Sequence, residues 1–222
     1  MRIVLLVSLL AAAALPQASP IGMFAGSNDV GEPPLKGGVV YDPATRQYKI
    51  TGTGTDIWGR ADQFHYAWRE ISGNFAVSAT AQFLTDGNPH RKASIMLRKS
   101  LDAGSAFVHL AIHGDGMPGV QFRATSGDTV NTLDFPIEGP GIFSLKLVRQ
   151  GGNVNVFVAK GDAPLRELGT TVLALGNPVL VGLAVASHNQ QALNTVLFSN
   201  VSIAPIAAPV PAPTAAPTPT PR

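Results

Sequence analysis

The strongest constraint on the fold of this chain is a repeated alternation of apolar and polar residues with a period of two. In one run, Phe75, Val77 and Phe83 lie on one side, and smaller or polar residues separate them. The same alternation recurs over residues 107–113 and 143–147. Because successive side chains of a strand point to opposite faces, each run predicts a half-buried β-strand.

Turn-forming residues separate these runs, among them Ser72-Gly73 and Gly151-Gly152. The run 179–186 is apolar on both faces, as expected of a central strand. We count about twelve strands and find no stretch with the pattern of a long helix. We therefore predict an all-β fold, a two-sheet antiparallel jelly-roll sandwich, because two sheets closed over one core bury the apolar faces of such a chain.

The two ends of the 222-residue chain differ in composition from its centre. Residues 1–18 carry Arg2, an apolar run and then small residues, which is the layout of a secretory signal peptide. The apolar run is shorter than the roughly 20 residues that span a bilayer, and an uncleaved anchor is the alternative. Residues 204–222 are almost entirely Ala, Pro, Thr and Val, which favours an extended tail. We expect one exported domain over residues 19–203, periplasmic or secreted, with no transmembrane segment in the mature chain.

Composition excludes several classes of function. The chain has no cysteine, which excludes thiolate metal sites and thiol nucleophiles. Its 16 basic and 14 acidic residues are scattered, so we expect no nucleic-acid partner. The densest basic patch is His90-Arg91-Lys92, which is either a solvated loop or part of a site.

A series of segments, taken in order, is similar to a known group of proteins. The segments are residues 48–54, 56–58, 62–68, 72–75, 90–98, 113–116, 121–123, 181–189 and 198–201. Together they resemble bacterial exported domains of the concanavalin A-like lectin/glucanase superfamily, of the so-called regulation-of-enolase type, over residues 26–203. This resemblance implies a jelly roll with a curved, ligand-facing sheet and implies no agreed activity. Such domains often accompany TolB-type propellers, whereas this chain carries only the Pro-rich tail.

Strand parity predicts a mixed polar and apolar face. If the strands around residues 93–99, 107–113 and 120–123 are neighbours, their polar positions share one side of a sheet. Guanidinium and amide groups hydrogen-bond sugar hydroxyls, and apolar groups cover sugar C–H faces. The alternative is that the arginines pair with acids such as Asp62 and rigidify the sheet. The side chains predicted on this face are Met96, Arg98, His109, Gln121 and Arg123.

The segment from Asp56 to Trp68 concentrates aromatic residues. We expect Trp58, after a Gly-Thr-Gly-Thr turn, either at the rim of a site as a stacking platform or packed in the core. Asp62 and His65 lie in the same segment, and His188 follows the buried run 179–186. His188 is either a ligand contact or base, or a backbone-bonded residue. Trp58, Asp62, His65 and His188 complete the predicted ligand-binding set.

Neither catalysis nor metal binding has a clear signature. The four glutamates Glu32, Glu70, Glu138 and Glu167 have no acid two residues away, which argues against the paired carboxylates of glucanases. His109 and His113 would lie about 13 Å apart on a strand, at roughly 3.3 Å per residue, too far to share zinc. We expect no cofactor, with calcium at Asp115 or Asp128 as an alternative.

Three functional hypotheses follow. The first is a non-catalytic binding module for a carbohydrate or another cell-envelope polymer. The second is a glycan-active hydrolase or lyase that uses Asp62, His65 or His188. The third is a protein-interaction domain, tethered through residues 204–222 to proteins of an envelope complex.

Overall fold

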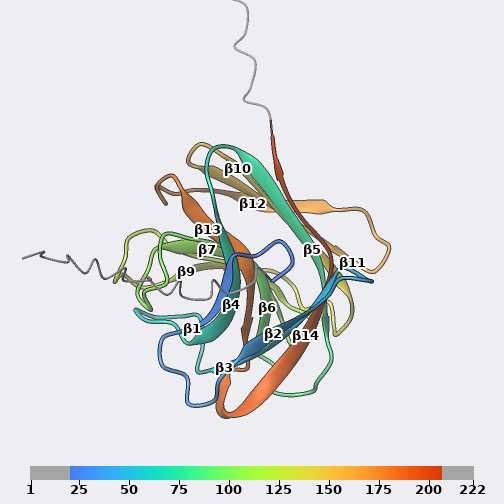
Figure 1. The fold of residues 1–222 in the computed structure, drawn as a ribbon. Helices are drawn as coiled ribbons and strands as arrows, with labels where there is room; N and C mark the ends of the chain where they lie inside the picture. Colours follow the sequence, from blue (N-terminus) through green and yellow to red (C-terminus); the bar gives the residue numbers. More distant parts are fainter. Residues whose placement is uncertain (1–20, 207–222) are drawn as a thin grey trace, which may run out of the picture.

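The computed structural model describes residues 21–206, which form two antiparallel seven-stranded sheets (Figure 1). The first sheet has the order β1 (Gly26–Val30), β4 (Phe64–Ile71), β13 (Val179–Ala186), β6 (Lys92–Arg98), β7 (Phe107–His113), β8 (Pro118–Arg123) and β9 (Asn131–Asp134). The second has the order β12 (Arg166–Val172), β11 (Asn153–Lys160), β10 (Phe143–Gln150), β5 (Phe75–Phe83), β14 (Asn189–Pro205), β3 (Gln47–Gly54) and β2 (Gly38–Asp42). The predicted all-β sandwich is confirmed, with 14 strands where the sequence indicated about twelve.

The second sheet follows the alternation of its sequence. Strand β10 alternates strictly between buried and half-buried positions, and β5 does so over most of its length. One face of this sheet therefore packs on the core, and its other face meets solvent. Phe75, Leu145 and Phe198 contribute large apolar side chains to the core between the sheets.

The centre of the first sheet is buried on both faces. Every residue of β6, β7 and β13 is buried, although β6 and β7 carry polar side chains at alternate positions. A second, smaller apolar cluster on the outer face of this sheet includes Phe64, Met96 and Phe107, together with Ile57 from the segment before β4. The segment of residues 55–63, named here the cover loop, thus packs over a sheet face that the strand pattern alone leaves open.

The last strand, β14, runs to Pro205 and so extends two residues past the predicted domain end at residue 203. Ala204 and Pro205 pair with Ala76 and Phe75 of β5, and the Ile206 amide donates to the Asn74 carbonyl at 3.0 Å. Figure 1 shows this strand leading to the C-terminal end. The predicted signal peptide, residues 1–18, lies outside the described residues, as do residues 207–222 of the tail predicted over residues 204–222.

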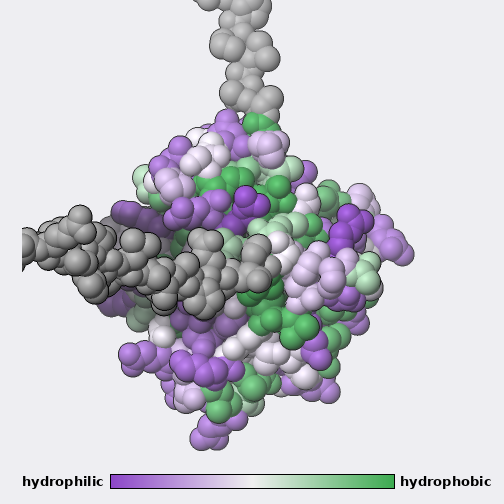
Figure 2. Space-filling model, in the orientation of Figure 1, coloured by the Kyte–Doolittle hydropathy of each residue, from purple (hydrophilic) through white to green (hydrophobic). Residues whose placement is uncertain are grey.

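On the face seen in Figure 2, hydrophobic residues lie in small groups among hydrophilic ones. Within residues 21–206, no helix is long and apolar enough to cross a membrane.

Candidate functional site

A buried charge cluster lies on the outer face of the first sheet, where strands β6 and β8 end. The Asp62 carboxylate, from the cover loop, lies between the guanidinium groups of Arg98 on β6 and Arg123 on β8. Arg98 Nη1 donates to Asp62 Oδ2 at 2.7 Å, and Arg123 Nη2 donates to Asp62 Oδ1 at 2.7 Å. All three side chains are fully buried. The structure therefore contains the alternative arrangement, in which the two arginines pair with Asp62 and do not face a ligand.

The same two arginines also bind the backbone of three loops. Arg98 and Arg123 donate to carbonyls of the cover loop, of residues 99–106 and of residues 124–130. The acceptors within 3.1 Å include Gly59, Ser100, Ala103, Ser105 and Asp128. Burial lowers the pKa of Arg98, and the Asp62 carboxylate opposes this effect. The cluster thus fastens three loops over the sheet and closes this part of its face.

Several predicted ligand residues lie beneath this cover. Met96 and His109 are fully buried, and His109 donates from Nε2 to Gln121 Oε1 at 2.9 Å in the orientation found. Burial holds the pKa of His109 well below its usual value, so its imidazole is neutral near pH 7. His65 lies apart from this face, with Nδ1 2.8 Å from Asp29 Oδ1. Met96, Arg98, His109 and Arg123 share one face, as predicted, but that face is not an open groove.

An open cavity of about 280 Å³ lies beside the beginning of the cover loop, between this loop and residues of β6, β7 and β8. We name it the Trp58 cavity. Trp58 lies at the edge of this cavity and is 41% exposed, as expected of a residue at a rim. The residues that line this cavity are Asp56, Trp58, His90, Lys92, His113, Met117, Gln121, Asp134 and His188.

Lys92 and Asp56 form the ion pair inside the cavity. Lys92 Nζ donates to Asp56 Oδ1 at 2.5 Å and to the Ile57 carbonyl at 3.3 Å. The ammonium also lies 5.5 Å from the centre of the Trp58 ring, a distance at which a cation is attracted to an indole face. Burial lowers the pKa of Lys92, and Asp56 opposes this shift. These contacts hold the beginning of the cover loop against the first residue of β6.

Two side chains from β7 and β8 present unused polar atoms to the cavity. His113 Nδ1 bonds to the Met117 carbonyl at 3.0 Å, so Nδ1 carries the proton and Nε2 keeps its lone pair. Burial, followed by the charge of Lys92, lowers the pKa of His113 and favours this neutral form. The Gln121 oxygen is taken by His109, whereas its amide nitrogen makes no hydrogen bond to any residue between 21 and 206. One acceptor and one donor are thus available to a ligand.

His188 lies at the opposite side of the cavity from these two residues' strands, directly after β13. Its backbone has a φ of 54°, an uncommon conformation for a residue other than glycine. Its Nδ1 lies 3.4 Å from Asp56 Oδ2, without hydrogen-bond geometry. The His90 ring lies between the other two imidazoles, with ring centres 5.5 Å from His188 and 6.2 Å from His113. Within the described part of the chain, no three His, Asp or Glu side chains are arranged to hold a metal ion.

Of the nine predicted ligand residues, the Trp58 cavity brings together Trp58, Gln121 and His188. Sequence reasoning missed Asp56, Lys92 and His113 as partners of these residues. Strand alternation could have indicated two of them, because residues 92 and 113 lie on the same face of the sheet as Met96 and His109. The residues that the sequence analysis did not place in the site are Asp56, His90, Lys92, His113, Met117 and Asp134.

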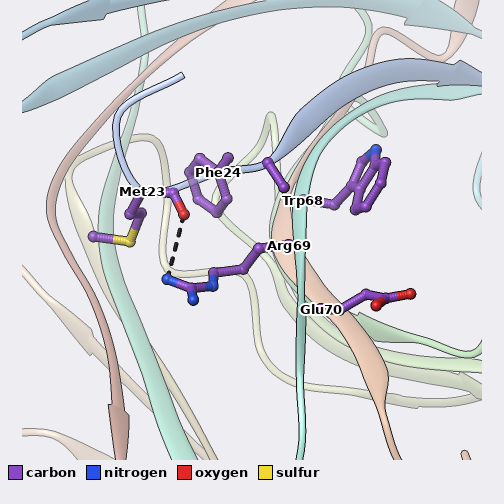
Figure 3. Close-up of a pocket in the computed structure, with 6 residues that line it drawn as sticks. Met23, Phe24, Trp68, Arg69 and Glu70 are labelled. Atoms are coloured by element: carbon purple, nitrogen blue, oxygen red, sulfur yellow. Dashed lines mark hydrogen bonds between the residues drawn. The ribbon is translucent and has the colours of Figure 1, made fainter. Parts of the chain in front are cut away.

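A second cavity, of about 560 Å³, lies at the β1–β4 edge and contains the other tryptophan. Figure 3 shows the Trp68 ring and the Arg69 guanidinium on opposite sides of β4, as strand alternation requires. The Arg69 Nη1 donates to the Met23 carbonyl at 3.5 Å, and Trp68 Nε1 donates to Asn28 at 2.8 Å. The Trp68 indole and the Arg69 guanidinium diverge from each other and are already bonded, so the Trp58 cavity is the better candidate site.

Comparison of the fold with solved structures defines its class. A functionally unknown protein from Saccharomyces cerevisiae superposes with a TM-score of 0.60 at 16% identity, over 82% of this chain and 97% of that one. The carbohydrate-binding module CBM66 from Bacillus subtilis gives 0.54 at 15% identity, over 84% and 99%. Lectin II from Ulex europaeus in complex with galactose gives 0.52 at 10% identity, over 76% and 90%. The chain therefore has the concanavalin A-like lectin/glucanase fold.

The fold also occurs in a prokaryotic beta-1,3-1,4-glucanase, which superposes with a TM-score of 0.51 at 7% identity over 76% of this chain and 83% of that one, and in part of a GH43 protein. The GH43 protein BlXynB from Bacillus licheniformis matches with a TM-score of 0.53 at 15% identity, over 81% of this chain and 39% of that one. No family model matches the sequence, and no curated protein matches it. At these sequence identities the structural similarity establishes the fold alone, and the activity has to be inferred from the residues of the site.

Proposed function

We propose that this protein is an exported, non-catalytic carbohydrate-binding module and that its ligand binds in the Trp58 cavity. One observation carries the proposal: a half-exposed indole borders a cavity whose wall holds the unbonded amide nitrogen of Gln121 and the unbonded Nε2 of His113. An indole covers the C–H face of a sugar ring, while amide and imidazole groups bond its hydroxyls. Asp56 Oδ2 adds a carboxylate acceptor on the third side.

The size of the cavity suits a small part of a glycan. Its volume of about 280 Å³ lies just below the roughly 300–1,000 Å³ common for ligand pockets. The cover loop and the Asp62 cluster close the adjoining sheet face, so a long chain has no groove to cross. A single sugar ring, at a chain end or on a side branch, fits this shape. Membership of the regulation-of-enolase group, export and an envelope location stay predictions.

Substitution of Trp58 tests the site directly. We expect Trp58→Ala to weaken binding of a glycan found by array screening at least tenfold, which corresponds to about 1.4 kcal/mol, because the stacking surface is removed. Isothermal titration calorimetry measures the effect. Trp68→Phe is the matched control: it changes the other tryptophan and leaves Trp58 as the sole indole. In that variant, ligand should change the Trp58 fluorescence; binding without such a change, together with unaltered affinity in Trp58→Ala, would place the site elsewhere.

A glycan-active enzyme is the second candidate, favoured by the short distance between His188 and Asp56 in the cavity. Asp62 and His65, the other predicted catalytic residues, are bonded to Arg98 and Asp29 respectively and do not line the cavity. Turnover of polysaccharides that is lost in His188→Ala would favour the enzyme. Binding without turnover favours the module. Pull-down with the full chain and with a chain that ends at residue 206, which keeps the pairing of β14 with β5, tests the third hypothesis, tethering to envelope proteins.

A further inference from the structure

Arg91, which precedes β6, is a buried cation that lacks an acidic partner. The residue is only 7% exposed. Its Nη1 donates to the carbonyls of Gly87 at 2.9 Å and Asn88 at 3.0 Å, and the guanidinium lies 4.6 Å from the centre of the Phe83 ring. Between residues 21 and 206, no carboxylate lies within 4.0 Å of it, and its Nε is buried without a hydrogen bond.

Other buried cations of the first sheet are paired. Lys92 contacts Asp56, and Arg98 and Arg123 share Asp62. A buried charge is costly unless it is paired or hydrogen-bonded. Burial accordingly lowers the pKa of Arg91, although the more distant Asp86 and Asp115 oppose the shift. Arg91 thus has unused capacity to bind an anion.

The Arg91 side chain borders a cavity of about 410 Å³, within the usual range of roughly 300–1,000 Å³ for ligand sites. The Phe83 ring lies beside the guanidinium, and Leu84 and Ile142, which are 46% and 45% exposed, add apolar surface to the cavity wall. Gly114 gives the guanidinium its space, because a Cβ at this position would lie 2.4 Å from Arg91 Nη1. The residues that line the cavity are Gln82, Phe83, Leu84, Thr85, Asp86, Arg91, Gly114, Pro140, Gly141 and Ile142.

We propose that this cavity is a second ligand site, which binds a small monocarboxylate with an apolar body. The positive guanidinium of Arg91 takes the carboxylate through Nη2, which makes no hydrogen bond to any residue between 21 and 206. Leu84 and Ile142 contact the apolar body. Asp86, also in the lining, repels a second negative charge and so disfavours phosphate and other dianions. This site does not depend on sugar binding in the Trp58 cavity.

Nuclear magnetic resonance titration of the full chain with benzoate tests the proposal. We expect saturable shifts of the Gly87 and Gly114 amides with benzoate, and at least tenfold weaker binding of the uncharged isostere benzamide and of inorganic phosphate. Asp86→Asn should tighten benzoate binding severalfold, because it removes the repelling charge. Arg91→Gln should abolish the shifts. Arg69→Gln is the matched control, because Arg69 lines a different cavity, and should leave benzoate binding unchanged.

Three patterns of binding would overturn the proposal. They are equal binding of benzoate and benzamide, tighter binding of phosphate than of benzoate, and benzoate shifts that persist in Arg91→Gln. If Arg91→Gln does not fold, the comparison of the three probes on the unaltered protein and the effect of Asp86→Asn decide the question. An absence of saturable shifts in the unaltered protein also overturns the proposal.

Discussion

At the scale of single residues, the hydrogen-bonding atoms that the Trp58 cavity offers depend on the protonation of His113 and His109. His113 acts as an acceptor at Nε2 only while it is neutral, and burial together with Lys92 maintains that state. His109, beneath the cavity, is neutral for the same main reason and fixes the orientation of Gln121. Two buried histidines thus determine which hydrogen-bonding atoms a ligand meets.

The same histidines make stability depend on pH. The pKa of both histidines is lowered in the folded state. Below about pH 6.5, these histidines are therefore protonated in the unfolded chain but remain neutral in the folded chain. The free energy of unfolding is therefore expected to fall as the pH decreases below that value, by up to about 1.4 kcal/mol per pH unit for each residue. Urea unfolding between pH 7.5 and pH 5 measures this dependence.

His113→Gln isolates one contribution to this dependence, because all other titrating groups are retained. The variant should lose the part of the slope that His113 produces and keep the part that comes from His109, whose pKa is the more strongly lowered. His90→Asn, at an exposed position, should keep the full slope. An identical pH dependence in the unaltered protein and in His113→Gln would contradict the assignment.

At the scale of elements, the cover loop converts a sheet face into a cavity. The Asp62 carboxylate receives hydrogen bonds from β6 and β8, and the Asp62 amide donates to the Ala103 carbonyl at 3.0 Å. At the other end of the loop, Asp56 is held by Lys92. Trp58 lies between these two attachments, so its position depends on both.

Removal of the Asp62 charge should therefore affect both stability and binding. Asp62→Asn leaves two buried guanidinium groups without an ion-pair partner, and a broken buried pair typically costs about 3–5 kcal/mol. Urea denaturation gives the free energy of unfolding, and glycan titration gives the effect through Trp58. Asp128→Asn removes an equal charge from an exposed side chain nearby and should change stability by less than about 0.5 kcal/mol. A loss below about 1 kcal/mol in Asp62→Asn would show that the carboxylate does not hold the loop.

At the scale of the whole molecule, the two sheets enclose one large core, and β14 runs along the second sheet to Pro205. A chain that ends at residue 203 loses the pairing of Ala204 and Pro205 with β5 and the bond from the Ile206 amide. A chain that ends at residue 206 keeps them.

This difference gives a prediction about the domain boundary. We expect the chain that ends at residue 203 to be less stable by about 1–3 kcal/mol than the one that ends at 206, since a backbone hydrogen bond contributes about 0.5–1.5 kcal/mol. Thermal and urea unfolding of both truncated chains measure the difference. Equal stability would place the functional end of the domain at residue 203, as the composition of the sequence indicated.

The sequence alone determined the class of fold and the side of the sheet on which each residue lies. Alternation is a local property of a strand, so parity placed Met96 and Arg98 on one face of their strand, and the pairing of β6 with β7 brought His109 to the same face. The tertiary structure decided which part of that face is open. Asp62 meets Arg123 across 61 residues, and Lys92 meets Asp56 across 36. Such pairings depend on how a loop without periodicity folds over the sheet, and no local sequence pattern predicts the path of that loop. The loop buries the two arginines, and the open site therefore lies beside Trp58.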